Sequence, residues 1–245
     1  MTGRLDRTKP CIALITAILA LSTLDLCAGD INGTVKFKGK PRKPRPMKKL
    51  AADTACAAMH DTLPVDEKFV YAESGEAGVV TLGNVFVWVR GGLPETEYEI
   101  PAEPVVINQE GCTFVPHVLG IRAGQDLEIR NGDKTAHNVN AQPKRNKGFN
   151  NAQPPATRPL IKNFKREEVM VKFACDMHTW MSCYVGVVSH PFYAVTGKDG
   201  AFSLKNLPAG EYEVEVWHEL LKTQSQTVKV ADGEATSIEF LYAKP

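Results

Sequence analysis

Apolar and polar residues alternate along most of the chain beyond residue 30, which is the pattern of strands with one buried face. The alternation is clearest at 34–38, 84–90, 126–130, 169–175 and 211–218. Glycine-containing turns separate these segments, and amphipathic helix patterns are scarce apart from residues 50–60. The predicted fold class is therefore all-β. Residues 143–158 are polar and rich in proline, and we predict a surface loop there.

The first residues have the pattern of an export signal. Arg4, Arg7 and Lys9 precede an apolar run of 14 residues at 11–24, and small residues follow at 27–29. A helix needs about 20 apolar residues to cross a membrane, so this run is too short for a stable span. We predict that residues 1–28 are a signal peptide and that the protein is periplasmic or secreted. A retained anchor is the alternative.

Charge and cysteine content limit the function classes. The chain has 29 basic and 28 acidic residues, so no strong field for nucleic acid is present. Removal of residues 1–28 leaves 26 of each sign. Four cysteines then remain in an oxidising compartment, where disulfides form, and they are Cys56, Cys112, Cys175 and Cys183.

The C-terminal segment carries its own β pattern. In the stretch AVTGKDGAFSLKNLPAGEYEVEVWHE, alternation predicts Tyr212, Val214 and Val216 inward and the glutamates between them in water. This stretch resembles the second half of the carboxypeptidase regulatory-like, transthyretin-like β-sandwich. The strands that resemble the first half stand instead near the N-terminus, at 33–41 and 84–90. We therefore predict that 30–98 and 191–245 form one discontinuous sandwich around an inserted domain at 99–190. Three consecutive units are the alternative.

Four residues of the insert carry donor atoms for a soft metal ion. They are His137 and the Cys-x-x-His-x-x-Met group of Cys175, His178 and Met181. Two imidazoles, a thiolate and a weak axial thioether suit copper that alternates between two oxidation states, whereas hard cations prefer carboxylates. Chance spacing, with Met181 as ordinary core filling, is the alternative.

The sequence around these donors resembles the plastocyanin-like blue copper proteins, or cupredoxins. The resemblance covers residues 114–188 and rests on VLGIRAGQDLEIRNGDKTAHNV together with KFACDMHTWMSCYVGVV, whose short ligand loop is most similar to that of amicyanins. It implies a Greek-key barrel inserted in, or flanked by, the small sandwich, and one type 1 copper ion. It also implies that Asn138 braces the ligand loop and hydrogen-bonds near the thiolate.

The remaining cysteines have separate predictions. With Cys175 assigned to the metal, Cys56 and Cys112 are the best candidates for a disulfide. A second metal site with the nearby His60 and His117 is the less favoured alternative, because a closed site lacks its fourth donor. Cys183 is predicted to be an inert buried thiol.

The predicted function is one-electron transfer between a redox donor and a redox acceptor, without catalysis. Trp180 is a candidate for partner docking beside an exposed edge of His178, and ordinary packing is its alternative. The basic stretch at 36–49 is predicted to be a solvated, extended loop, and steering of an acidic redox partner is the alternative. Asp176 follows Cys175, so the His-Cys-His bridge of multicopper oxidases is missing. Alternatives are a copper carrier or tolerance protein without electron transfer, and a carbohydrate- or surface-binding β module.

Overall fold

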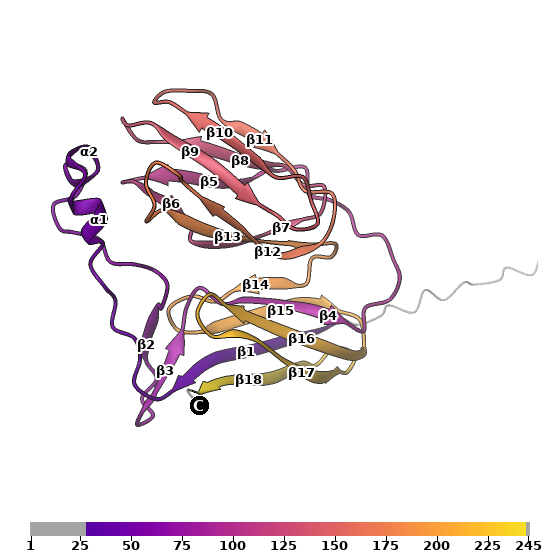
Figure 1. Cartoon of the computed structure of the whole chain (residues 1–245). Helices are drawn as coiled ribbons and strands as arrows, with labels where there is room; N and C mark the ends of the chain where they lie inside the picture. The colour runs from indigo at the N-terminus through magenta and orange to yellow at the C-terminus, as the bar shows by residue number, and fades with distance from the viewer. Residues whose placement is uncertain (1–27, 244–245) are drawn as a thin grey trace, which may run out of the picture.

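The structure, a computed structural model, describes residues 28–243, which form two stacked β bodies (Figure 1). The predicted signal peptide lies outside the described residues apart from Ala28. Half of the chain is strand and 4% is helix, which confirms the predicted all-β class. None of the helices between residues 28 and 243 is long and apolar enough to cross a membrane.

The first body is a sandwich of two sheets that combine strands from both ends of the chain. One sheet contains β1 (Gly29–Lys38), β2 (Tyr71–Glu73), β3 (Val79–Leu82), β15 (Ala201–Leu207) and β18 (Ala235–Ala243). The other contains β4 (Phe86–Gly91), β14 (Tyr193–Val195), β16 (Gly210–His218) and β17 (Lys222–Val230). β1 runs parallel to β18 from the pair Asp30–Ala235 to the pair Lys38–Ala243, and β4 pairs with both β14 and β16.

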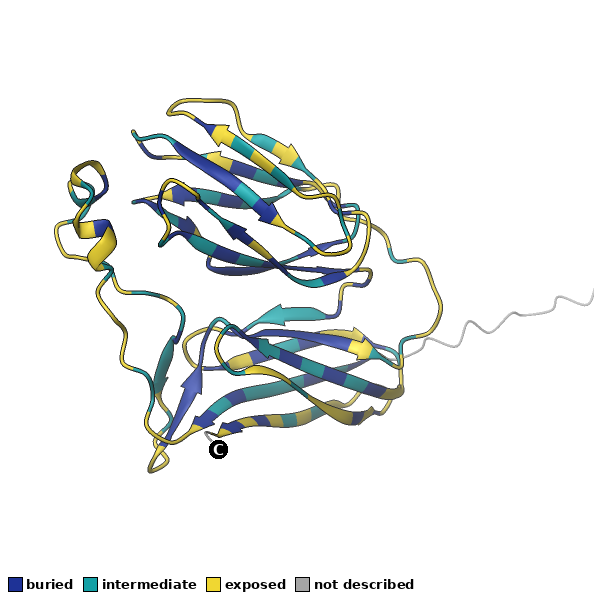
Figure 2. Cartoon of the chain, in the orientation of Figure 1, coloured by how far each residue is buried: buried dark blue, intermediate teal, exposed yellow. Residues whose placement is uncertain are grey.

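Alternation along the strands explains how the sandwich buries its core (Figure 2). In β16 the side chains of Tyr212, Val214 and Val216 are buried and Glu211 is exposed, as the pattern predicts, whereas Glu213 and Glu215 are half-buried where Arg90 pairs with both. Burial of one such valine contributes roughly 1.5–3 kcal/mol relative to leaving it in water. A one-residue slip of β16 would turn the glutamates inward, so the pattern fixes the register.

The second body is a barrel formed by the inserted segment. Its first sheet contains β7 (Val118–Arg122), β9 (His137–Gln142), β10 (Phe149–Gln153), β12 (Glu168–Ala174) and β13 (Ser182–Val188). Its second sheet contains β5 (Val105–Glu110), β6 (Thr113–Val115), β8 (Leu127–Asn131) and β11 (Leu160–Lys162). The pairs β7–β13 and β5–β8 are parallel, so they cannot be simple hairpins, and the chain crosses between strands that are distant in sequence.

Aromatic rings and two glycines hold the bodies face to face. Phe86 and Tyr193 of the sandwich stack with ring centroids 5.8 Å apart. Their rings occupy the space where a Cβ on Gly120 or Gly186 of the barrel would stand. Only residues without a side chain allow this close approach, so a substitution at either glycine would push the bodies apart.

One segment differs from its predicted structure. Within the predicted loop at 143–158, residues 149–153 form β10, which pairs along its whole length with β9. Pairing with an established strand supplies the backbone hydrogen bonds, and this outweighs the weak strand preference of the asparagines. β10 is the edge strand of this sheet and covers the edge of β9, whose first residue is His137.

The connection between β1 and β2 leaves the sandwich and reaches the barrel (Figure 1). It contains two short helices, α1 (Lys48–Ala51), which overlaps the segment 50–60 where the sequence favours a helix, and α2 (Thr54–Ala57), which lies within it. Leu50 and Cys56 are fully buried and belong to the core cluster of the barrel, not to that of the sandwich. We call residues 48–60 the cover segment, because they lie over the candidate site described next.

Candidate metal centre

The four predicted ligands come from two places in the barrel. His137 is the first residue of β9, and the other three lie in the short connection between β12 and β13. In this ligand loop the Met181 amide donates to the carbonyl of His178 at 2.8 Å, and the Cys175 amide donates to the carbonyl of Met181 at 3.3 Å. These two bonds turn the loop back on itself and bring Cys175 and His178 together.

Three of the predicted ligands converge in the interior. Nδ1 of His137 lies 2.9 Å from Nδ1 of His178, and Sγ of Cys175 lies 3.7 Å from the same His178 atom. The side chains are buried, with exposed fractions of 0% for His137, 2% for Cys175 and 6% for His178. Their donor atoms all lie within 4.8 Å of one another, the spacing of a group that can share one metal ion.

A carboxylate faces the outward nitrogen of each histidine, at hydrogen-bond distance from His137 and at a longer ion-pair distance from His178. Nε2 of His137 is 2.8 Å from Oδ2 of Asp133, and Nε2 of His178 is 3.8 Å from Oδ2 of Asp53. A carboxylate that holds one ring nitrogen leaves the other nitrogen free to bind a metal and fixes the orientation of the ring. Both Nδ1 atoms are therefore oriented toward the thiol.

Hydrogen bonding shifts the protonation of this group. Burial alone would raise the pKa of Cys175, but hydrogen bonds from His137 and from the backbone amides around it hold this pKa below its usual range. Burial would lower the pKa of His137, whereas its bonds to Asp133 and Cys175 raise that pKa to about 9. The surroundings thus favour a Cys175 thiolate beside a protonated His137, and a metal ion that binds both residues would displace the His137 proton.

Asn138 connects the ligand loop to β9. Its Oδ1 accepts from the Cys175 thiol at 3.3 Å and from the backbone amides of Asp176 at 2.7 Å and Met177 at 3.2 Å. Its Nδ2 donates to Asn150 on β10 at 2.7 Å and to the Asp176 carboxylate at 2.9 Å. One side chain next to His137 therefore fixes the start of the loop that carries the other ligands.

Met181 lies in the same core cluster as Cys175 and is 2% exposed. It follows the turn at His178 and directly precedes β13. Its thioether is a soft donor, and a buried position at the end of the ligand loop is compatible with a weak axial ligand. The alternative, ordinary core packing, is equally compatible with this burial.

Two carboxylates at the centre were not identified from the sequence. Asp133 accepts from His137 and also from the amides of Gly111 at 2.7 Å and Cys112 at 2.8 Å. Its position four residues before His137, in an Asn-Gly-Asp turn, was an available signal for a partner of a ligand histidine. Asp53 had no such signal, because it lies 84 residues before the first predicted ligand, His137.

The cover segment shields the centre from solvent. A disulfide joins Cys56 of α2 to Cys112 beside β6, and the two sulfurs lie within 4.8 Å of a His178 nitrogen. Asp53 caps α2 by accepting from the amides of Ala55 and Cys56, both at 3.0 Å. The prediction of an exposed edge on His178 is therefore wrong, because the disulfide and Asp53 cover it.

Trp180 also packs against the covered side of the centre and contacts both Cys112 and His178. Its Nε1 donates to the carbonyl of Cys112 at 3.0 Å, and its ring centroid lies 5.0 Å from that of His178. The side chain is half-buried. It therefore supports the ligand loop from one side and leaves only part of its surface for a partner.

The other residues considered as ligands have different partners. Cys56 and Cys112 are bonded to each other, His60 contacts the carbonyl of Gly111 at 2.8 Å, and His117 contacts Glu219 at 2.9 Å. The second site proposed as an alternative around His60 and His117 is therefore not formed. Cys183 is fully buried, and burial raises the pKa of its thiol, as expected for an inert group.

The donor set fits copper. A thiol disposed to ionise and two imidazoles are the ligands of trigonal copper sites with a weak axial thioether, and the carboxylates of Asp133 and Asp53 lie against the Nε2 atoms of the two histidines. His137, Cys175 and His178 would hold the ion together with Met181, and the ion would supply a one-electron couple. Asp133, Asn138 and the disulfide would restrain these ligands.

Comparison with known proteins gave similar structures but no family. No protein-family model and no curated protein matches the chain. It is similar to a copper-containing nitrite reductase from Thermus scotoductus SA-01, with 17% identity, a TM-score of 0.34 and coverage of 41% of this chain and 26% of that chain. It is also similar to a purple cupredoxin from Nitrosopumilus maritimus, with 22% identity, a TM-score of 0.29 and coverage of 34% and 98%.

Amicyanin from Paracoccus versutus is a third similar structure, with 21% identity, a TM-score of 0.31 and coverage of 41% of this chain and 96% of that chain. The chain thus spans about a quarter of the nitrite reductase and nearly all of the two smaller proteins. The similar structures are cupredoxins, matched at low identity and low coverage of this chain.

Proposed function

We propose that this chain is an exported protein that binds one type 1 copper ion through His137, Cys175, His178 and Met181, and that it carries single electrons between a redox donor and a redox acceptor. The observation that carries the proposal is the convergence of two Nδ1 atoms and one thiol in a buried space. A bound copper ion would supply a one-electron couple. The residues of the chain would keep the positions of the copper ligands the same in both oxidation states.

Rigidity of the ligands is the contribution of the protein. Asn138, Asp133 and the Cys56–Cys112 disulfide each restrain a different ligand or its backbone. A site that changes little between two oxidation states needs little reorganisation when an electron arrives. Burial of the three donors also favours retention of the ion, which supports electron transfer over the alternative of a copper carrier that must release its cargo.

We propose that the chain is not an enzyme, because its candidate ligands leave no open position for a substrate at the centre. Catalytic metal sites keep such a position. The proposal includes a sandwich of the carboxypeptidase regulatory-like type, supported by the pairing of β1 with β18 and of β4 with β16. The sandwich supports the barrel and contributes Glu219 to the pocket described below.

Voltammetry combined with copper analysis tests this function. We expect a reversible one-electron wave and an unchanged copper content after repeated cycles of reduction and oxidation. Rapid loss of copper on reduction would instead identify a carrier protein. Met181→Ala is expected to change the reduction potential, because it removes the axial thioether. Met177→Ala is the matched control, since Met177 lies in the same loop with its side chain in solvent and 58% exposed.

A further inference from the structure

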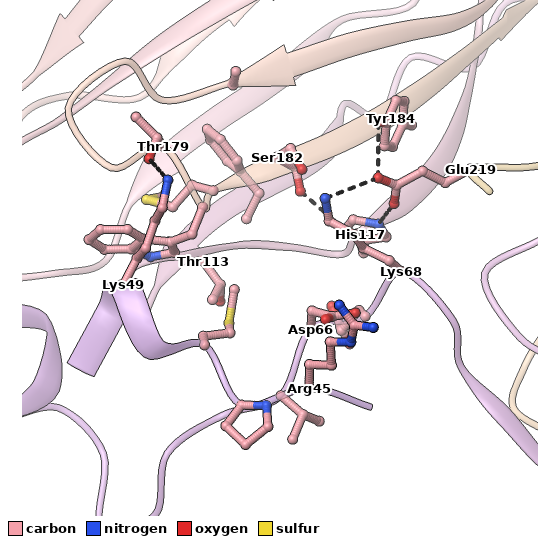
Figure 3. Close-up of a pocket in the computed structure, with 18 of the residues that line it drawn as sticks. Arg45, Lys49, Asp66, Lys68, Thr113, His117, Thr179, Ser182, Tyr184 and Glu219 are labelled. Carbon is pink, nitrogen blue, oxygen red and sulfur yellow. Dashed lines mark hydrogen bonds and ion pairs between the residues drawn. The ribbon is translucent and has the colours of Figure 1, made fainter. Parts of the chain in front are cut away.

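A cavity of about 730 Å³ lies where the chain between β1 and β2, the barrel and the sandwich meet (Figure 3). On one side Lys49 donates to Thr179 of the ligand loop at 3.4 Å, and on the other His117 and Tyr184 both contact Glu219. We call it the junction pocket. Thr179, Trp180, Met181 and Ser182 form one wall, so the pocket adjoins the candidate metal centre directly.

Positive charge dominates the lining of the junction pocket. Arg45, Lys48 and Lys172 line it and are exposed, and none of them forms an ion pair with any residue between 28 and 243. They come from separate parts of the chain, two from the segment before α1 and in α1, and one from β12. An anion that enters the pocket would therefore meet uncompensated cations from two sides.

Most carboxylates of the lining are already neutralised. Asp66 pairs with Arg42 at 3.1 Å, and Glu219 lies 2.9 Å from His117 and 3.6 Å from Lys68. Glu67 is the remaining acidic residue of the lining, against four cations that form no ion pair with the described residues, Arg45, Lys48, Lys49 and Lys172. The balance of unpaired charge is positive, so a cationic occupant would be repelled.

The pocket is also the open approach to the ligand loop. The edge of His178 is covered by Asp53 and the disulfide. By contrast, the junction pocket is lined by residues 179–182 of the ligand loop, and Trp180 and Met181 add apolar surface to its wall. A reductant in the pocket would therefore lie next to one candidate ligand, Met181, and on the other side of the same loop from His178.

We propose that the junction pocket binds a small anionic electron donor and that electrons reach the centre there, instead of through the edge of His178. The redox part of this inference rests on the proposed function, whereas the binding of an anion does not. With hexacyanoferrate(II) as the donor, [Fe(CN)₆]⁴⁻ loses one electron to become [Fe(CN)₆]³⁻, and Cu(II) gains it to become Cu(I). No bond is broken and no proton moves.

Binding is tested with hexacyanochromate(III), an inert paramagnetic anion, added to the reduced, diamagnetic chain. We expect broadening of the amide resonances of Thr179, Trp180 and Ser182, and a dissociation constant about tenfold weaker in Lys48→Glu and in Lys172→Glu. Lys165→Glu is the matched control, because Lys165 is an exposed residue of the barrel outside the pocket. Broadening elsewhere only, or equal losses in all three variants, would overturn the proposal.

Stopped-flow kinetics test the redox part with the copper-loaded chain. Reduction by hexacyanoferrate(II) should slow with added salt and slow about tenfold in Lys48→Glu, while reduction by the cation hexaammineruthenium(II) should not slow. Equal slowing of both reagents would overturn the assignment, because the variant would then act on the centre itself. Anion binding without any copper spectrum would refute the proposed function and leave the pocket as a binding site.

Discussion

Asn138→Ala is the substitution that tests most sharply how the ligand loop is held. It removes an acceptor that serves the Cys175 thiol and the amides of Asp176 and Met177, together with a donor to Asn150. The three groups that donate to Oδ1 lose their acceptor at once. The start of the loop, between the end of β12 and the turn at His178, then keeps only the bond from Asn140 to Asp176 as a side-chain anchor on β9.

The expected loss of stability follows from these bonds. A typical intramolecular hydrogen bond contributes about 0.5–1.5 kcal/mol net. Asp176 and Met177 are themselves exposed, so water replaces part of the lost bonding at their amides. We therefore use the lower half of that range, about 0.5–1 kcal/mol, for each of the five bonds that the Asn138 side chain makes, which predicts a decrease of about 2.5–5 kcal/mol in the free energy of unfolding.

Urea unfolding followed by tryptophan fluorescence measures this decrease, and hydrogen exchange at the amides of Asp176 and Met177 locates it. Asn140→Ala is the matched control, because Asn140 is also on β9 but makes a single side-chain bond, to Asp176 at 2.9 Å. We expect its effect to stay below about 1 kcal/mol. Equal losses in the two variants, or unchanged exchange at both amides in Asn138→Ala, would refute the role assigned to Asn138.

Two further predictions concern stability. The disulfide closes a separation of 56 residues, so replacing both Cys56 and Cys112 by Ala should lower the free energy of unfolding by up to about 4 kcal/mol; an unchanged urea midpoint would contradict this. Burial lowers the pKa of His218 from 6.5 to about 4. The unfolded chain therefore binds the proton more readily, and this residue's contribution to stability is lost as the pH falls from about 6.5 toward 4. Between pH 7 and 5 the loss is about 2 kcal/mol, and it should be absent in His218→Asn, as urea titrations at both pH values would show.

The positions of the strands and the residues that can donate to a metal could both be predicted from the sequence. Tyr212, Val214 and Val216 are buried as their alternation predicts, because a strand with one wet face requires this pattern. The spacing of Cys175 and His178 reflects a turn short enough to return both side chains to one point, and the structure brings them together with His137. The alternation is a local pattern and the donor set depends on residue type, so neither requires knowledge of contacts between distant parts of the chain.

Long-range contacts could not be predicted in the same way. Residues 149–153 become a strand only because β9 offers a free edge, and nothing in their own composition signals this. Asp53 reaches His178 because Cys56 is bonded to Cys112, and a distance between two cysteines cannot be inferred from their positions in the chain. The cover over the centre, and with it the junction pocket, therefore had to be seen in three dimensions.

The copper centre itself is tested most directly by adding Cu(II) to the purified chain and recording its visible absorption and electron spin resonance spectra. We expect an intense thiolate-to-copper band that Cys175→Ser abolishes. Cys183→Ser is the matched control, because Cys183 is the other free and buried thiol among the described residues, and it should keep the band. A chain that gives no such band, or a Cys175→Ser variant that retains it, would contradict the assignment of copper to these ligands.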